Sequence, residues 1–422
     1  MAAGGLADGI DRLVIVGASL GAARVVEEAR RTGFTGSIVV VGREKHAPYD
    51  RPPLTKDFLT AAAEPELVEH LPAPEALGVT LMTGTTALSL DTRNRRVRTE
   101  RGDIGYDVLV IATGAQPRAL DVPGGDLLGV TTLRSVEQAR LVRGALEPGA
   151  RVVVVGAGFI GGEIASSARA RGAEVTLVEA SPLPLAGAVG PLVAERLAYL
   201  HRQYGVRLLK STKVREITGN GAVEKVRLDD GSVVPADLVV VGIGVDPVTG
   251  WLRGSGVAVS DGVACSTYLE STVPGVYAVG DVARWVNQWN GRLSRLEHWT
   301  SAGEQAVAVA RNALTTDRSP CGVVPYFWSE WHGHKLQMLG EPADEVELAG
   351  DRSGATDPFL AQYRYDGDVV GAFALDRTGP LMKLRTAVRN RTSWEAMLGA
   401  PTPAGAAGTT APPHRGARLI GP

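Results

Sequence analysis

The stretch VVVVGAGFIG, from Val152 to Gly161, decides the fold of this chain. Four consecutive valines are typical of a strand buried on both faces, and the glycines after them favour a tight turn into a helix. Together they predict the start of a βαβ unit, which continues to a second strand from Glu174 to Val178. In such a unit the backbone amides of the glycine turn can approach a pyrophosphate at the positive end of the helix.

The N-terminal part of the chain repeats this pattern. LVIVGASLG, from Leu13 to Gly21, is again a strand and a glycine turn, although Ser19 replaces the middle glycine. The unit continues with a polar helix from about Arg24 to Arg31 and a strand from Ser37 to Val41. Two copies of one unit predict an α/β protein with two dinucleotide-binding regions built on parallel sheets.

Each copy also has an acid after its second strand, where a ribose would lie. Glu44 follows the first copy, and Glu179 follows the second. A carboxylate there accepts hydrogen bonds from free ribose hydroxyls and repels a 2′-phosphate. Residues 180–187 contain no Arg or Lys, so Glu179 predicts NADH rather than NADPH. One glycine pattern alone is also consistent with an ordinary tight turn, whereas two copies with acids favour two dinucleotide sites.

Length and composition exclude several classes of protein. A chain of 422 residues predicts about three domains. Its net charge of -2 argues against a nucleic-acid partner. The two cysteines, Cys265 and Cys321, form no CxxC pair, which excludes a disulfide framework, a zinc knuckle and a dithiol redox pair. No signal peptide or membrane-spanning apolar run is present, so we expect a cytoplasmic protein, as a monomer or weak dimer.

The rest of the chain predicts further elements and a third domain. Asp229 to Ser232 lies between two alternating runs and predicts a hairpin. Short strands such as Lys335 to Leu339 and Phe359 to Tyr365, followed by a helix from Leu381 to Asn390, predict a separate α+β domain. Residues 400–422 are rich in Pro, Gly and Ala and predict a disordered tail.

Two further stretches resemble the FAD pattern of flavoproteins that bind two dinucleotides. TVPGVYAVGD, from Thr272 to Asp281, is a turn, a buried strand and a Gly-Asp pair that would face phosphate or ribitol hydroxyls. Ala112-Thr113-Gly114 follows a predicted strand from Asp107 to Ile111. The resemblance implies FAD in the first unit and a nicotinamide in the second. The simpler alternative is that Gly280-Asp281 is an ordinary turn at the end of a strand.

A set of motifs in a fixed order narrows the resemblance. The motifs are PYDRPPLTK at 48–56, GGE at 161–163, VGIGVDP at 241–247, EHW at 297–299 and PYFWS at 325–329. In this combination the chain, from Leu13 to Trp394, resembles the oxygenase-coupled ferredoxin reductases. That family implies two Rossmann-like three-layer domains of the glutathione-reductase type and a C-terminal α+β domain. The implied domains are residues 11–126 with 250–324 for FAD, 127–249 for NADH and 325–399 for the reductase domain, with 400–422 as the tail.

The family pattern also implies cofactor-binding residues at named positions. Those implied around FAD are Gly17, Ser19, Leu20, Gly21, Glu44, Arg51, Lys56, Ala87, Thr113, Gly114, Arg134, Gly280, Asp281, Glu297, His298, Trp299 and Trp328. Those implied around NADH are Gly156, Gly158, Phe159, Ile160, Gly161, Glu163, Glu179, Gly242, Ile243 and Gly244. Two departures, Arg43 in place of a common acid and a short stretch between Lys56 and Gly84, concern the adenosine contacts more than the chemistry.

The resemblance implies two catalytic residues, Lys56 and Glu163, as an ion pair beside the flavin that reaches across the two nucleotide sites. Because desolvating each ion costs several kcal/mol, a pair in a dry cleft is expected to have a use. The implied use is that Lys56 stabilises the negative charge that the hydride brings. The simpler alternatives are a lysine at the start of a surface helix and a glutamate favoured by the helix dipole.

Two other groups of residues have equally simple alternatives. Trp299 and Trp328, which the family places near the flavin, could be core aromatics. His298, His332 and His334 suggest a metal, but His332 and His334 lack a matching distant cluster and a third ligand, so we expect no metal site.

The cysteines and the resemblance together predict which molecule accepts the electrons. No cysteine precedes Cys265, so the chain lacks the cysteine pair of disulfide reductases and the single cysteine of related NADH oxidases. The electrons must therefore leave to a diffusible acceptor, and the resemblance implies an iron–sulfur ferredoxin that feeds a monooxygenase or dioxygenase. The alternatives are a signalling flavoprotein like apoptosis-inducing factor and a rubredoxin or generic NADH:acceptor reductase.

A basic cluster predicts where such a ferredoxin would dock. It consists of Lys383, Arg385, Arg389 and Arg391, with no acid between Leu381 and Trp394. On one helix these residues would form a broad basic face, and an acidic ferredoxin would be steered toward it. The alternative is a solvated helix face without a partner.

Overall fold

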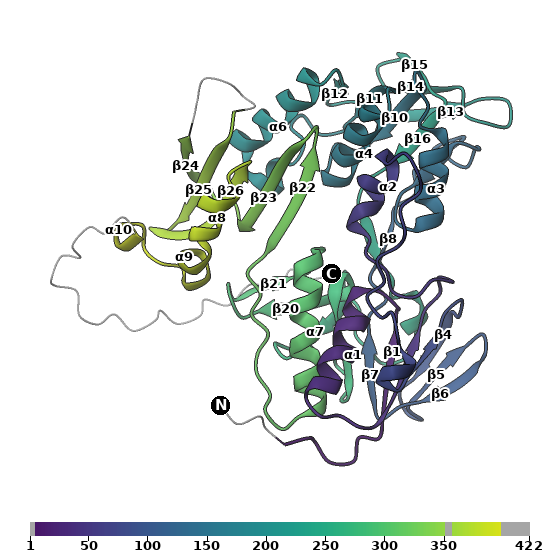
Figure 1. Ribbon diagram of the computed structural model, residues 1–422, viewed down its shortest axis with the longest axis vertical. Coiled ribbons are helices and arrows are strands. Elements are labelled where there is room, and N and C mark those ends of the chain that lie inside the picture. Colours follow the sequence, from purple (N-terminus) through teal and green to yellow (C-terminus); the bar gives the residue numbers. More distant parts are fainter. Residues whose placement is uncertain (1–4, 351–356, 398–422) are drawn as a thin grey trace.

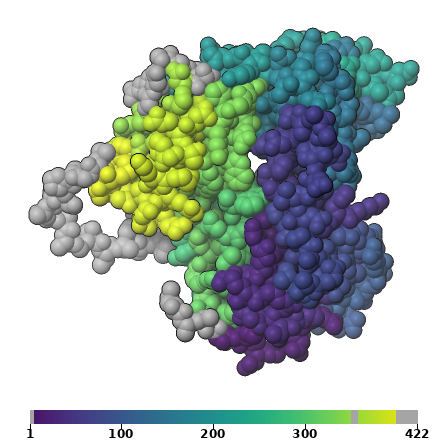
Figure 2. All heavy atoms as spheres, in the orientation of Figure 1, coloured from purple at the N-terminus to yellow at the C-terminus, as the bar shows by residue number. Residues whose placement is uncertain are grey.

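The computed structural model describes residues 5–350 and 357–397, which form three regions (Figure 1). The region with the purple N-terminal chain lies at the bottom of the view, the teal region at the upper right, and the yellow region at the left. The space-filling view shows a green segment between the yellow region and the purple and blue ones (Figure 2). The three regions therefore meet along this segment.

The first region is built on a five-stranded parallel sheet. Its strands, in order across the sheet, are β19 (Val276–Ala278), β7 (Val108–Ile111), β1 (Arg12–Val16), β2 (Ser37–Val41) and β3 (Val79–Met82). Helix α1 (Leu20–Arg31) packs against α7 (Trp299–Leu314) beside this sheet. β19 comes from late in the chain, which supports a discontinuous FAD domain, although the domain boundaries themselves stay a prediction.

The second region repeats this design. Its parallel sheet contains β12 (Arg207–Leu209), β11 (Glu174–Val178), β10 (Arg151–Val155), β16 (Leu238–Val241) and β9 (Val130–Thr132). Its helices are α3 (Val136–Ala145), α4 (Phe159–Ala170), α5 (Ala186–Val189) and α6 (Pro191–Gln203). The four valines of β10 are buried, as expected for a central strand covered on both faces.

The third region is an antiparallel sheet with short helices on it. The strands, in order, are β22 (Tyr326–Trp331), β23 (His334–Gly340), β26 (Asp368–Leu375), β25 (Phe359–Tyr365) and β24 (Glu345–Gly350). The helices are α8 (Thr378–Lys383), α9 (Arg385–Asn390) and α10 (Trp394–Met397). β22, at the edge of this sheet, packs on α4 of the second region and α7 of the first.

Smaller elements complete the first two regions. The short sheets are β4 (Ala87–Asp91) with β5 (Arg96–Thr99) and β6 (Gly102–Gly105), β13 (Val214–Thr218) with β14 (Lys225–Leu228) and β15 (Val233–Pro235), β8 (Ala115–Pro117) with β17 (Val245–Pro247), and β18 (Val263–Cys265) with β20 (Ala283–Asn287) and β21 (Arg292–Ser294). The short helical turns are η1 (Pro52–Thr55), α2 (Asp57–Thr60), η2 (Glu75–Leu77), η3 (Gly250–Leu252) and η4 (Gly280–Val282).

The predicted fold class is confirmed, and two helices need correction. α1 begins at Leu20 rather than near Arg24, because its first turn is apolar and packs inward, whereas the prediction followed the polar residues later in the helix. The helix predicted from Leu381 to Asn390 is divided into α8 and α9. The division falls at Leu384, whose amide donates three residues back to Leu381, a tighter turn that ends α8.

The outer limits of the chain add two facts. In the part of the chain that the structure describes, no helix is both long and apolar enough to span a membrane. The tail predicted at residues 400–422 lies outside the described residues.

Candidate active site

The first glycine turn, between β1 and α1, requires glycine at Gly17. Its φ is +112°, and a Cβ atom there would lie 2.1 Å from the carbonyl oxygen of Ala112 at the end of β7. Ser19 is the N-cap residue of α1, but its side chain does not cap the helix. The amides of the first turn, from Leu20 and Gly21 onward, are therefore available to a pyrophosphate.

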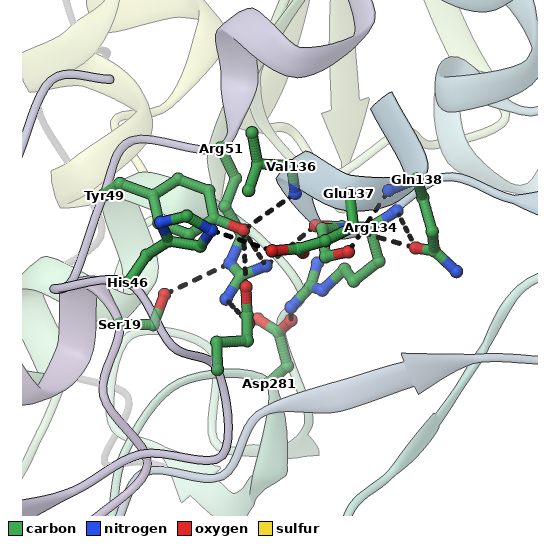
Figure 3. Close-up of polar contacts among 11 residues, drawn as sticks. Ser19, His46, Tyr49, Arg51, Arg134, Val136, Glu137, Gln138 and Asp281 are labelled. Atoms are coloured by element: carbon green, nitrogen blue, oxygen red, sulfur yellow. Dashed lines mark hydrogen bonds and ion pairs between the residues drawn. The ribbon is translucent and has the colours of Figure 1, made fainter. Parts of the chain in front are cut away.

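The acid of the first copy, Glu44, is held by two side chains of the PYDRPPLTK motif. The Tyr49 hydroxyl donates to Glu44 Oε2 at 2.6 Å, and Arg51 Nη2 pairs with Glu44 Oε1 at 2.5 Å. Arg51 also donates to the backbone carbonyl of Arg134 at 2.7 Å. Figure 3 shows Tyr49, Arg51 and Arg134 gathered at one place, with Ser19 beside them. Part of the acceptor capacity of Glu44 is thus already used by the protein, and its contact with a ribose stays a prediction.

Arg134 and Asp281 bring two other segments to the same place. Arg134 Nη2 pairs with Asp281 Oδ2 at 2.9 Å (Figure 3). Gly114 lies next to this pair with a φ of +63°, and a Cβ atom there would be 3.7 Å from Arg134 Nη2. The amide of Gly280 is fixed by Gln305 at 2.8 Å. Three separate segments therefore converge at the carboxyl end of the first sheet, the edge at which α/β sheets bind ligands.

The second glycine turn, between β10 and α4, requires glycine at two positions. A Cβ atom on Gly156 would lie 2.3 Å from the carbonyl oxygen of Gly242, and one on Gly161 would lie 1.9 Å from that of Gly156. Gly158, the N-cap residue of α4, has no protein atom within 4 Å of the place where a Cβ would be. The turn is closed toward the protein and open at Gly158, which fits the close approach of a pyrophosphate.

The acid of the second copy reaches its own glycine turn. Glu179 Oε2 accepts from the amide of Ala157 at 2.8 Å, and Glu179 Oε1 accepts from the amide and hydroxyl of Ser181 at 2.8 and 2.6 Å. The other predicted NADH residues lie on the same edge of the second sheet: Phe159 and Ile160 open α4, and Gly242, Ile243 and Gly244 follow β16. The second site is therefore assembled from consecutive pieces of one region.

Lys56 and Glu163 form the predicted ion pair. Their catalytic role stays a prediction. Lys56 Nζ lies 2.7 Å from Glu163 Oε2, and Glu163 is only 3% exposed. The Thr55 hydroxyl donates to the same oxygen at 2.5 Å, and the Ser329 hydroxyl donates to Glu163 Oε1 at 2.6 Å. One buried carboxylate on α4 thus binds residues of the connection between β2 and β3 and of the C-terminal sheet. The simpler alternative, a glutamate favoured only by the helix dipole, does not explain these contacts.

The two tryptophans lie together and outside the core. Their rings meet edge to face with centroids 5.8 Å apart, and Trp299 is 36% exposed. Trp299 Nε1 donates to Asp50 Oδ1 at 2.8 Å. The pKa of Asp50 is lowered: burial opposes the shift, and the hydrogen bonds from His70 and Trp299 outweigh it. The reading of Trp299 and Trp328 as core aromatics is therefore wrong.

The remaining predicted FAD residues are more scattered. Thr113 donates to the backbone of Val248 at 2.8 Å, and Ala87 opens β4 of a small sheet. Glu297 is ion-paired with Arg295 at 2.7 Å. His298 is the N-cap residue of α7, and burial lowers its pKa to about 4. The contribution of these four residues to FAD binding stays a prediction.

The histidines of the third region are used in protein contacts. His332 lies 3.1 Å from His201 between ring nitrogens, and His334 is bound to Asp376 at 2.6 Å. Residues 5–350 and 357–397 contain no group of three or more His, Cys, Asp or Glu side chains placed to hold a metal.

Sequence reasoning missed four residues that shape the site. They are Tyr49, Asp50, Thr55 and Ser329, all inside motifs that the sequence had marked. Hydroxyl and carboxylate side chains in those motifs were the available signal. Their partners lie far along the chain, so only the folded structure identifies them.

Fold and site together define an oxidoreductase with two dinucleotide sites. The chain belongs to the pyridine nucleotide-disulphide oxidoreductase family, whose model matches residues 11–306, and residues 326–401 match the family described as reductase C-terminal. As a member of this family it uses FAD and NAD(H), and the two glycine turns fit these groups.

Its relatives confirm the narrower resemblance. The chain is 34% identical over 374 residues to the ferredoxin–NAD(+) reductase component of the biphenyl dioxygenase system of Paraburkholderia xenovorans, covering 87% of this chain and 91% of that protein. It is 36% identical over 332 residues to rhodocoxin reductase of Rhodococcus erythropolis, covering 78% of each. The structure of a covalent putidaredoxin reductase–putidaredoxin complex matches with 30% identity and a TM-score of 0.86, covering 92% of this chain and 95% of that chain.

Proposed function

We propose that this protein takes a hydride from NADH onto FAD and passes single electrons to an iron–sulfur ferredoxin of an oxygenase system. The observation that carries the proposal is the Lys56–Glu163 ion pair, which links the connection between β2 and β3 to α4 in a chain whose two cysteines are both unreactive. Both cysteines are free, and burial raises the pKa of each to about 12. Neither is a thiolate at neutral pH, so an external acceptor is required.

In this proposal FAD, when bound, supplies the chemistry that converts a two-electron donor into a one-electron donor. The protein positions the two dinucleotides and supplies charged groups around them. Lys56 supplies a fixed positive charge where the hydride arrives, and Glu163 holds its ammonium group in place. Glu179 selects the nucleotide through its ribose, and Arg134 with Asp281 anchors the first dinucleotide. Trp299 and Trp328 cover the side of the site from which electrons leave, and they keep water away from that side.

The ferredoxin is proposed to dock on the basic cluster of Lys383, Arg385, Arg389 and Arg391. Lys383, Arg385 and Arg389 are exposed, and α9 packs on β23 and β26, next to β22 with Trp328. Burial raises the pKa of Glu304 on α7, and Arg385 and Arg389 oppose that rise, so the cluster lies close to the helix that Trp299 begins. The cluster spans two short helices, which spreads the charge over a wider surface than one helix would. Electron-transfer partners bind weakly, so such charge acts mainly on the encounter rate.

The test is anaerobic stopped-flow reduction of the flavin by NADH, followed by mixing with a two-iron ferredoxin of an oxygenase system. We expect rapid flavin reduction and one-electron reduction of the ferredoxin. Fast reduction by NADH with no electron transfer to any ferredoxin tested, but transfer to rubredoxin, would identify a rubredoxin reductase instead. Very slow reduction by NADH would favour a signalling flavoprotein.

A charge-reversal pair tests the docking surface. Replacing Arg385 and Arg389 by Glu should lower ferredoxin reduction by about tenfold at low ionic strength and flatten its salt dependence, while ferricyanide reduction stays unchanged. The matched control replaces the exposed Arg93 and Arg98, near β5, by Glu, with the same change in net charge. Equal losses in both double variants would show that net charge, not this cluster, controls the encounter.

We place the reaction in the cytoplasm, the compartment that two free cysteines favour.

A further inference from the structure

The carboxylate of Glu163 has two differently occupied oxygens. Oε2 receives Lys56 Nζ and the Thr55 hydroxyl, both from the connection between β2 and β3, whose η1 and α2 pack on α3 and α4. Oε1 receives the hydroxyl of Ser329, which belongs to β22 of the C-terminal sheet. Ser329 is fully buried, so water does not reach this hydroxyl to replace it. The C-terminal sheet therefore supplies one of the three side chains bound to this carboxylate.

β22 is fastened to α4 at several points around Glu163. A Cβ atom on Gly162 would lie 2.3 Å from the indole ring of Trp331, so this strand and this helix are in closest contact one residue before Glu163. Trp331 Nε1 donates to the carbonyl of Phe159 at 3.3 Å, and the amide of His332 donates to Ser166 Oγ at 2.6 Å. Ser329 is thus held by a rigid strand, and its hydroxyl has a fixed position relative to the carboxylate.

The same strand, β22, also carries Trp328. Successive side chains of a strand point to opposite faces, so Trp328 and Ser329 face different ways. Trp328 meets Trp299 of the first region, whereas Ser329 meets Glu163 of the second. β22 therefore contacts both Trp299 and the Lys56–Glu163 pair.

We infer that Ser329 is a positioning residue for hydride transfer, through which the C-terminal sheet fixes the Lys56–Glu163 pair. The inference rests on the proposed role of that pair. A buried carboxylate oxygen that loses its donor keeps the full cost of desolvation, so its charged form is destabilised. The carboxylate can then turn or take up a proton, and Lys56 loses its fixed partner. Hydroxyl donation from Ser329 prevents both changes.

The experiment compares Ser329→Ala, Ser329→Thr and the near-isosteric Ser329→Cys as holoenzymes. We expect Ser329→Ala to lower the limiting rate of flavin reduction by NADH about tenfold, to change the apparent NADH Kd little, and to move the acid limb of the pH–rate profile to higher pH. Ser329→Thr should restore the rate, and the weak thiol donor of Ser329→Cys should give an intermediate one. Wild-type rates and pH profiles in both Ser329→Ala and Ser329→Cys would overturn the inference.

Ser167→Ala is the matched control. Ser167 is also buried at this junction, but its hydroxyl donates to the carbonyl of Thr55 at 2.7 Å rather than to Glu163. We expect its limiting rate and pH profile to remain those of the wild type. An equal change in Ser167→Ala and Ser329→Ala would assign the effect to packing and contradict the inference.

A double-mutant cycle tests whether Ser329 affects the reduction rate through Glu163. If Ser329 acts through Glu163, then Ser329→Ala should have no further effect in a Glu163→Gln background. Additive losses would overturn the inference while leaving the proposed role of the pair intact. Conversely, wild-type reduction rates in Lys56→Met and Glu163→Gln would refute the pair itself, so the two failures are distinguishable.

Discussion

The two glycine turns of this protein share one local design but differ in what surrounds them. The first, at Gly17, is approached by side chains from other parts of the chain, with Arg51, Arg134 and Asp281 joined by hydrogen bonds and ion pairs. The second, at Gly156, is closed by its own region, where Glu179 binds the turn itself. The difference indicates a site that retains its dinucleotide and a site that exchanges it.

The comparison has a physical basis. A ligand held by groups from several segments leaves only if those segments separate, whereas a ligand on one βαβ unit leaves without such a change. FAD must stay through many turnovers, and NAD(H) must enter and leave in each.

The largest predicted effect is at this junction. Lys56→Met should lower the rate of flavin reduction by NADH about 100-fold, because a preorganised charge at the reacting atoms is lost, while FAD stays bound. Stopped-flow absorbance and the flavin content after gel filtration measure the two properties. Lys45→Met removes an exposed lysine near the first site and should leave both unchanged. Loss of FAD in Lys56→Met would make the lysine part of the retaining site instead.

The next effect concerns retention of FAD. Asp281→Ala should weaken FAD binding by about 10- to 100-fold, since it removes a charged hydrogen-bonding group and leaves Arg134 unpaired. Fluorescence of released flavin during dialysis measures the affinity. Asp237, which pairs with Arg151 in the second region, provides the matched control, and Asp237→Ala should keep its FAD. Equal flavin loss in both variants would remove the predicted asymmetry between the sites.

A smaller effect should appear as nucleotide preference. Glu179→Ala should reduce the preference for NADH over NADPH about tenfold, because the carboxylate that repels a 2′-phosphate is gone. Ratios of kcat/KM for the two nucleotides measure it. Glu174→Ala, at the other end of β11, serves as control and should keep the wild-type ratio. A wild-type protein that prefers NADPH would refute this assignment of Glu179.

The smallest effect is the response to acid. Burial lowers the pKa of His201 to about 3 and that of His332 to about 4, from an ordinary value of 6.5. Both are neutral when folded, so their stabilisation is complete above about pH 6.5 and is lost as the pH falls toward 4. Other titratable or charged groups near them are Arg169, Tyr204, His334 and Asp376.

Hydrogen exchange checks this prediction. On going from about pH 7 to about pH 5, opening of α6 and the β22–β23 turn should become easier by the order of 1 kcal/mol relative to α1, after correction for intrinsic exchange rates. His201→Gln should reduce that difference, whereas His46→Gln, at a partly exposed histidine beside Glu137, should not. Uniform acid loosening of all three regions would contradict it.

Sequence reasoning reached most of the fold because the βαβ signal is local. Four valines, a glycine turn and a following acid lie within one unit, so their pattern fixes β10, α4 and β11. It failed for the helix at Leu381, since the hydrophobic spacing of Leu381 and Val388 does not reveal the tighter turn between them. The predicted start of α1 near Arg24 was also too late, because that prediction followed the polar residues of the helix and not its apolar first turn.

The sequence predicted site residues only where they act within one motif or follow a family pattern. Lys56 and Glu163 were identified through resemblance, not through spacing. Ser329 and Asp50 were missed because each acts on a side chain more than 150 positions away in the chain, a pairing that only packing creates. Trp299 and Trp328 could not be separated from core aromatics until their exposure was known.

The central claim is that one site retains FAD and the other exchanges NADH. The most direct measurement is to pass the purified protein through gel filtration without added flavin, and then to mix it anaerobically with increasing NADH while following the flavin absorbance band. We predict about one FAD per chain after filtration, with bleaching whose rate saturates with NADH and is much slower with NADPH. A colourless protein that cannot be reconstituted with FAD, or a flavin that NADH does not reduce, would contradict the account.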